Sequence, residues 1–95
     1  MPYTVFITPA AVRDLEAVVD YYNGKAENLG KRFADLVNDY FERIASVPTA
    51  STVRYRDIRC KPMIIFPYLI MYTMNEATQT VNILRIFNTW QEPLW

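Results

Sequence analysis

Basic residues gather within residues 54–61, where they could take part in chemistry or in binding. The group consists of Arg54, Arg56, Arg59 and Lys61, with Asp57 as the acidic residue among them. Clustered cations bind phosphate groups or the carboxylates of a partner protein. Strand alternation would place Arg54 and Arg56 on one face and Arg59 and Lys61 on the other. The four side chains would then converge only if a bulge intervened. A solvated edge strand that uses charge to avoid aggregation has the same pattern, and both interpretations stay open.

Arg85 and two tryptophans are the remaining candidates for a binding role. Arg85 shares a predicted strand face with three apolar residues: Val81, Ile83 and Phe87. An unpaired cation is costly there, so Arg85 must pair with an acidic residue or open onto a groove that binds a partner. Trp90 and Trp95 follow in a polar tail. Each either caps the edge of the core or, if it is exposed, anchors a partner.

The residue types that the chain lacks limit its chemistry. It has no histidine and a single cysteine, Cys60. No imidazole is present to activate this thiol as a nucleophile, and we expect Cys60 to be an inert apolar residue. A lone cysteine forms no intramolecular disulfide, which fits a reducing compartment. Since imidazole and paired thiolate ligands are missing, we expect no metal site and no other cofactor.

Composition and charge predict a single globular domain. The chain has 95 residues, of which 52% are apolar, and its ten basic and ten acidic residues balance. A dedicated nucleic-acid binder is usually strongly basic, so this balance argues against that role without excluding a local basic patch. The longest apolar run, residues 63–71, is far too short to cross a membrane. We expect a cytoplasmic protein with no membrane partner.

The first half of the chain predicts a strand followed by a helical hairpin. β-Branched and aromatic residues alternate over residues 3–7, as in a short strand. Thr8 and Pro9 suit the cap and the first position of a helix, which we expect to end at Asn23-Gly24. A second helix is predicted from about residue 26 to residue 46, before Pro48. Its apolar stripe is Phe33, Val37, Tyr40 and Ile44, widened by Leu36 and Phe41.

The second half of the chain predicts strands. We place them at residues 53–59, 62–66, 68–74 and 80–87, with a turn at residues 75–78 and a bulge or bend at Pro67. The strand at 68–74 is apolar on both faces, which indicates a central strand or a face covered by a partner. The predicted order is β-α-α-β-β-β. This is an α+β fold with an N-terminal strand and a helical hairpin on an antiparallel sheet of three to four strands.

Several short motifs occur in a characteristic order along the chain. They are T-P-A-A-V-R-D-L, I-A-S-V-P, Arg59, F-P-Y-L-I-M-Y and T-V-N-I-L-R-I-F-N-T. In this order and spacing the chain resembles the RelE/ParE toxins, the toxin halves of bacterial type II toxin–antitoxin pairs of the plasmid-stabilisation type. The resemblance implies a toxin held inactive in a hetero-oligomer by a cognate antitoxin. A helix or extended segment of the antitoxin would wrap the toxin and lie in its surface grooves.

The resemblance leaves two classes of target. RelE-type members cut mRNA on the ribosome, whereas ParE-type members are associated with poisoning DNA gyrase. RNA cleavage through the 2′-hydroxyl needs a base, cations that stabilise the phosphorane, and an acid. Where RelE nucleases carry an arginine in the P-Y-x-I-x-Y strand, this chain has Leu69, and Trp90 replaces the arginine of relatives that read T-R-Q. The resemblance therefore implies a ParE-like toxin that binds a macromolecular target, with gyrase expected, and performs no chemistry of its own.

Two alternatives to this interpretation stay open. In the first, the chain is a RelE-type ribosome-dependent mRNA endonuclease, and Arg59, Lys61 and Arg85 are its catalytic residues. In the second, the chain has kept the fold and antitoxin binding but has lost toxicity. For the ParE-like interpretation, the expected partner-binding residues are Arg54, Arg56, Arg59, Arg85, Trp90 and Trp95.

Overall fold

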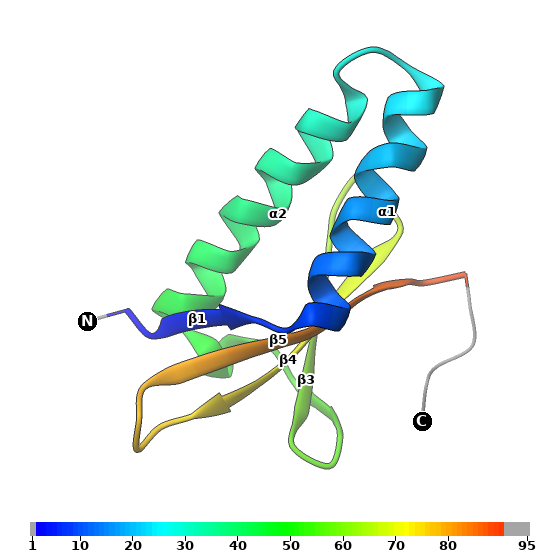
Figure 1. The fold of residues 1–95 in the computed structure, drawn as a ribbon. Coiled ribbons are helices and arrows are strands. Elements are labelled where there is room, and N and C mark those ends of the chain that lie inside the picture. Colours follow the sequence, from blue (N-terminus) through cyan, green and yellow to red (C-terminus); the bar gives the residue numbers. More distant parts are fainter. Residues whose placement is uncertain (1, 91–95) are drawn as a thin grey trace.

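The computed structural model describes residues 2–90 as two helices lying on one side of a five-stranded sheet (Figure 1). The elements are β1 (Thr4–Ile7), α1 (Pro9–Lys25), α2 (Leu29–Ser46), a 3₁₀ turn (Pro48–Ala50), β2 (Val53–Tyr55), β3 (Ile58–Pro62), β4 (Tyr68–Asn75) and β5 (Thr80–Asn88). The strand order is β1-β5-β4-β3-β2, and only the β1–β5 pair is parallel. The predicted α+β fold is confirmed, and β4 is the central strand.

The start of α1 follows its prediction, and the connection to α2 differs from it. The Thr8 hydroxyl accepts a hydrogen bond from the Ala11 N–H at 3.2 Å, as an N-cap does. The helix continues one residue past the predicted end at Asn23-Gly24, to Lys25. The Asn23 side chain instead accepts a hydrogen bond from the Gly30 N–H at 2.9 Å and so ties the two helices together. The second helix begins three residues later than predicted, after Asn28 in a left-handed conformation.

The main core lies between the helices and the sheet. The predicted α2 stripe is buried, and it packs against Tyr68, Ile70 and Tyr72 of β4 and against Val81 and Ile83 of β5. Four aromatic rings contact one another within this core: Tyr22, Phe33, Phe66 and Tyr68. Burying one such side chain contributes about 1.5–3 kcal/mol, so this cluster holds the helical hairpin on the sheet.

The predicted strands at 53–59 and 62–66 are wrong. The chain forms a tight hairpin instead, in which β2 and β3 are joined by the turn at Arg56-Asp57. Arg56 has a φ of 53°, and positive φ values suit the short turns whose twist matches that of paired strands. Such turns usually contain glycine or asparagine, and their absence here explains why the sequence pattern reads as one continuous strand.

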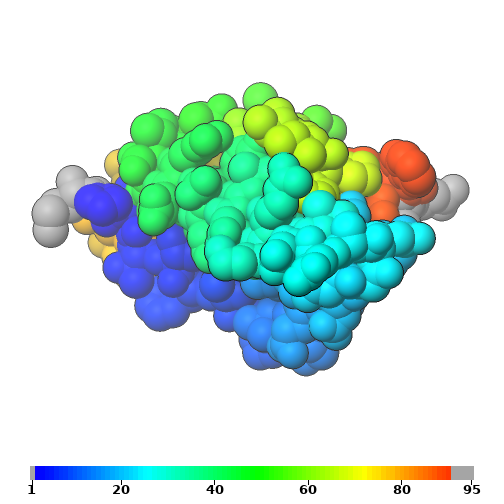
Figure 2. Space-filling model, turned by 90° about the horizontal axis from the view of Figure 1, so that it is seen from above, coloured from blue at the N-terminus to red at the C-terminus, as the bar shows by residue number. Residues whose placement is uncertain are grey.

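The expected bend before β4 is confirmed, and it is a strained turn at residues 63–67. The Phe66 N–H donates to the Ile64 carbonyl at 2.8 Å, and Ile65 between them has a φ of 73°. A γ-turn with positive φ is rare, and for a β-branched residue it costs about 1–3 kcal/mol. Figure 2 shows this segment, in yellow-green, lying beside α2. The rest of the fold therefore holds the turn in place.

The contact between the two helices generates a stability prediction for the glycines. A Cβ atom on Gly30 would lie 2.5 Å from the Val19 carbonyl oxygen, whereas one on Gly24 would meet no atom within 4 Å. We expect Gly30→Ala to lower the free energy of unfolding by about 1–3 kcal/mol through overpacking. Gly24→Ala should raise it by up to about 1 kcal/mol, because alanine favours the helix. Urea denaturation measures both, and a change of the same sign in the two variants would contradict the predicted helix contact.

Candidate functional site

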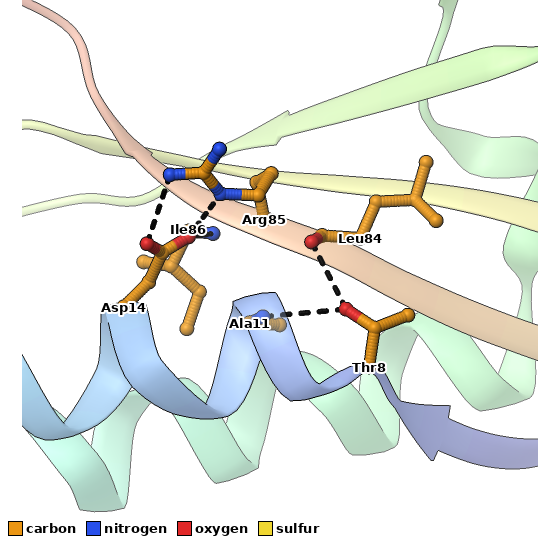
Figure 3. Close-up of polar contacts among 6 residues, drawn as sticks. All are labelled: Thr8, Ala11, Asp14, Leu84, Arg85 and Ile86. Carbon is orange, nitrogen blue, oxygen red and sulfur yellow. Dashed lines mark hydrogen bonds and ion pairs between the residues drawn. The ribbon is translucent and has the colours of Figure 1, made fainter.

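A salt bridge between Asp14 and Arg85 joins α1 to β5 (Figure 3). Arg85 Nε donates to Asp14 Oδ2 at 2.6 Å and Nη2 donates to Oδ1 at 3.0 Å, so the pair is bidentate. The hydrogen bond to Asp14 raises the pKa of Arg85 above its ordinary value. Arg85 thus pairs with an acid, the first of the two outcomes expected for it. It also keeps 39% of its side chain exposed, against 17% for Asp14.

A bulge in β5 takes Arg85 off the helix-facing side of the sheet, and its side chain meets Asp14 at the edge of β5 that β1 leaves uncovered. Tyr72 of β4 lies opposite Ile83, but the preceding Met71 lies opposite Arg85, so Leu84 is an extra residue in β5. The shift reverses the faces that follow: Ile86 packs into the main core, and Phe87 packs on the opposite face. The prediction of one shared face from Val81 to Phe87 is therefore wrong, because sequence alternation cannot show an inserted residue.

The start of α1 takes the place of a missing strand along this part of β5 (Figure 3). Strand β1 pairs with β5 only as far as Ile83. Beyond that point, the Thr8 hydroxyl donates to the Leu84 carbonyl at 3.1 Å, and the Ile86 N–H donates to Asp14 Oδ2 at 3.0 Å. Both backbone groups would otherwise lack a partner at a partly buried edge, which is costly. The salt bridge is thus one part of a larger junction between α1 and β5.

A groove of about 740 Å³ lies beside this junction, between α1 and the end of β5. Its lining includes the aromatic residues Tyr21, Tyr22, Tyr68 and Trp90, together with Arg85 and Asn88. Burial, followed by the nearby Tyr68 hydroxyl, raises the pKa of Tyr22 above its ordinary value. Trp90 is 86% exposed at the groove, and its backbone N–H is held by the Asn88 side chain at 2.8 Å. Trp95 lies outside the described residues.

The structure does not bring the four clustered cations together, because only Arg59 and Lys61 share one face of β3. Arg59 Nη1 donates to the Ser51 carbonyl at 2.7 Å, and Lys61 Nζ lies 5.8 Å from the centre of the Tyr40 ring, on the helix side of β3. Arg56 sits in the turn, with its guanidinium 5.2 Å from the centre of the Tyr55 ring, so its predicted place in a strand is wrong. Arg54 lies near the Cys60 thiol on the other face, as strand alternation predicts.

An apolar cluster lies on the sheet face away from the helices. Cys60, Met71 and Phe87 are buried there, and Ile58 and Leu69 pack against them. Burial raises the pKa of the Cys60 thiol, and Arg54 only partly opposes this, so the thiol is a weak nucleophile. Within residues 2–90, no group of three or more His, Cys, Asp or Glu side chains could hold a metal ion, and no helix is long and apolar enough to cross a membrane.

Sequence reasoning found the cation of the junction but not its partner. In the sequence Asp14 stands only within the T-P-A-A-V-R-D-L motif, and Thr8 was predicted only as a cap, yet both bind the edge of β5. The requirement that Arg85 find an acidic residue was the available signal. It could not choose among ten acidic residues without the bulge and the position of α1.

Comparisons with known proteins agree with this architecture. The family model for the ParE toxin of the type II toxin–antitoxin system parDE matches residues 5–93. A structure of the chromosomal ParDE system from P. aeruginosa covers 90% of this chain and 95% of that chain at 17% identity, with a TM-score of 0.77. The toxin–antitoxin complex RelBE2 from Mycobacterium tuberculosis covers 93% and 99% at 24% identity, with a TM-score of 0.62. At these identities the two structures show a shared fold. No curated protein matches the chain.

The junction predicts that Asp14 stabilises the fold more than its neighbours on α1. Asp14→Ala leaves the Ile86 N–H and Arg85 without their partner, and we expect the free energy of unfolding to fall by about 1–3 kcal/mol. Water can reach Arg85, which keeps the loss in the lower part of that range. Asp20 is an exposed acid on the same helix, and Asp20→Ala should change the free energy of unfolding by less than about 0.5 kcal/mol. Equal losses in the two variants, measured by urea denaturation, would rule out this role of Asp14.

Proposed function

The chain belongs to the ParE toxin family of type II toxin–antitoxin systems, and we propose that it acts by binding DNA gyrase in the cytoplasm. In this proposal a cognate antitoxin neutralises the toxin by forming a hetero-oligomer with it. The similar structures are those of toxin–antitoxin systems, which supports a partner of that kind. The toxin would inhibit its target by occupying a surface of it, without catalysing a reaction.

The distribution of cations is the observation that carries this proposal. A nuclease needs several cationic groups around one phosphate. Among the described residues, Arg59 and Lys61 lie on β3, whereas Arg85 lies on β5 and is bound to Asp14, with β4 between the two strands. Leu69 packs into an apolar face at the position where the resemblance would place a nuclease arginine. These positions favour binding over RNA cleavage and weaken the endonuclease alternative.

The groove beside the α1–β5 junction offers the chemistry of a protein-binding site. Arginine has five N–H donors, and Asp14 takes two of those on Arg85, which leaves donors for an acidic side chain of a partner. Exposed aromatic residues next to a fixed arginine are typical of the residues that dominate binding energy at protein interfaces. We therefore propose Arg85 and Trp90 as the centre of a partner-binding surface. Arg54, Arg56 and Arg59 stay predicted contributors to binding.

Two assays with the purified toxin separate binding from nuclease activity. We expect it to inhibit supercoiling by gyrase and to leave mRNA on translating ribosomes intact, because its cations do not converge. Addition of the antitoxin should restore supercoiling. Cleavage of mRNA with unaffected supercoiling would establish the endonuclease alternative. A chain that is inactive in both assays yet binds the antitoxin would be a non-toxic member of the family.

The groove predicts a specific role for Trp90. Trp90→Ala should weaken inhibition of gyrase by about tenfold or more, as truncation of a central aromatic anchor does. The melting temperature of the Trp90→Ala variant should equal that of the parent protein, because the Trp90 side chain is exposed. Phe6→Ala removes an exposed aromatic ring on β1, outside the groove, and should leave inhibition unchanged. Inhibition by Trp90→Ala at the level of the parent protein would remove Trp90 from the proposed site.

A further inference from the structure

Strand β1 is an edge strand whose sequence carries no charge. The strand order places β1 at one edge of the sheet, in blue in Figure 1, and β2 at the other. β2 and its turn carry Arg54, Arg56 and Asp57, and charged side chains of this kind keep an edge strand from pairing with other chains. Residues 1–12, which include all of β1, have no charged side chain. Only one of the two edges is therefore protected by charge.

The outer side of β1 offers backbone groups for a further strand. The Thr4 N–H points to the β5 side, where it donates to the Gln79 carbonyl at 2.9 Å. Because the backbone groups of successive strand residues point in opposite directions, those of Val5 and Ile7 point away from β5. These groups form no hydrogen bond with another residue of the described range 2–90. Each of the two residues thus presents one N–H donor and one C=O acceptor at the open edge.

The open part of this edge is short and has Phe6 at its centre. On one side, the Tyr3 N–H donates to the Ala45 carbonyl at 2.8 Å, so the end of α2 closes the edge there. On the other side, the chain turns into α1 at Pro9. Residues 4–8 lie between these two limits, and Phe6 is the middle residue. Its side chain is 54% exposed, although it is a large apolar group.

We infer that two copies of this chain pair through the β1 edge, as antiparallel strands related by a two-fold axis at Phe6. In such a contact the same surface serves both copies. The register that uses all of residues 4–8 places Phe6 opposite Phe6 of the second copy, and Val5 opposite Ile7. Each Val5–Ile7 pair then exchanges N–H···O bonds in both directions. The two sheets become one continuous sheet, and both open edges are closed.

The side chains of β1 complement themselves in this register. Val5 packs into the main core, so its neighbour Phe6 lies on the sheet face away from the helices. The two Phe6 residues form a non-hydrogen-bonded pair with Cα atoms about 4.5 Å apart, and aromatic pairs at such positions stabilise sheets. Ile7, which is 39% exposed, gains contact with Val5 of the second copy. No like charges face each other, which is why a second copy fits this edge.

The small size of the contact sets the strength of the pairing. Two strands of about five residues bury less surface than the about 1,200–2,000 Å² of stable complexes. We expect a reversible dimer with a dissociation constant on the order of 10–100 μM. The groove beside Arg85 contains no residue of β1, so each copy keeps its own groove with or without pairing. The inference therefore does not rest on the proposed function.

Disulfide trapping with the purified chain tests the register. Mild oxidation of Phe6→Cys should link most chains into dimers, because Cα atoms about 4.5 Å apart suit a disulfide. Thr4→Cys is the matched control on the same strand and face, since its two copies would lie about 13 Å or more apart, too far for a bond. Val53→Cys tests the exposed β2 edge and should not cross-link. The parent gives the background, because its Cys60 is buried.

A charge at the two-fold axis tests the strength of the pairing. Phe6→Lys places like charges opposite each other and removes the aromatic pair, so it should raise the dissociation constant of the dimer by about tenfold or more in sedimentation equilibrium. Val53→Lys adds the same charge to the β2 edge and should match the parent. Thermal unfolding of both variants should also match the parent, because both side chains are exposed.

The outcomes decide the inference without reference to gyrase or to the antitoxin. It holds if Phe6→Cys is the only cysteine variant that cross-links above the background, and if Phe6→Lys is the only lysine variant that weakens the dimer. It fails on any other result. Examples are a parent that stays monomeric at concentrations on the order of 1 mM, efficient cross-linking of Thr4→Cys, or one dissociation constant shared by the two lysine variants.

Discussion

The unequal lengths of β1 and β5 set the constraint on which the rest of the structure depends. β5 runs from Thr80 to Asn88, but β1 covers only its first part, up to Ile83. The remaining edge needs hydrogen-bond partners, and the start of α1 supplies them through Thr8 and Asp14. The helix is therefore fixed against the sheet by polar contacts as well as by apolar packing. The position of the groove follows, because its two walls are the two elements that this junction joins.

The parts of the fold that could be predicted are those in which local chemistry and burial agree. Thr8 and Pro9 start α1 because a hydroxyl cap and a proline suit that position. The α2 stripe from Phe33 to Ile44 has the period of a helix with one buried face. In these segments neighbouring residues alone specify the structure. The parts that could not be predicted depend on single residues in unusual conformations: Arg56 and Ile65 have positive φ without being glycine, and Leu84 is the extra residue of a bulge.

For the candidate site, the sequence predicted which residue types matter, but only the fold shows where they lie. Chemistry alone required a partner for Arg85, but only the fold identifies Asp14, which lies far away in the sequence. The four cations of residues 54–61 look like one cluster in the sequence. The turn at Arg56-Asp57 and the contacts of Arg59 and Lys61 with Ser51 and Tyr40 divide them among different surroundings. Spacing in the sequence predicts which residues lie close together only within one regular strand or helix. Here a turn divides the segment into two strands.

The parallel pairing of β1 with β5 also has a consequence for the order in which the toxin folds. Thr4 pairs with Thr80, so the ends of nearly the whole described chain must meet before the sheet is complete. Closing a loop of that length is entropically unfavourable, and contacts between distant residues slow folding. During translation, α1 and α2 leave the ribosome well before the strand that gives β1 and Asp14 their partners. A growing chain thus lacks its finished surface until β5 has been made, which delays any binding by that surface until this strand has paired with β1.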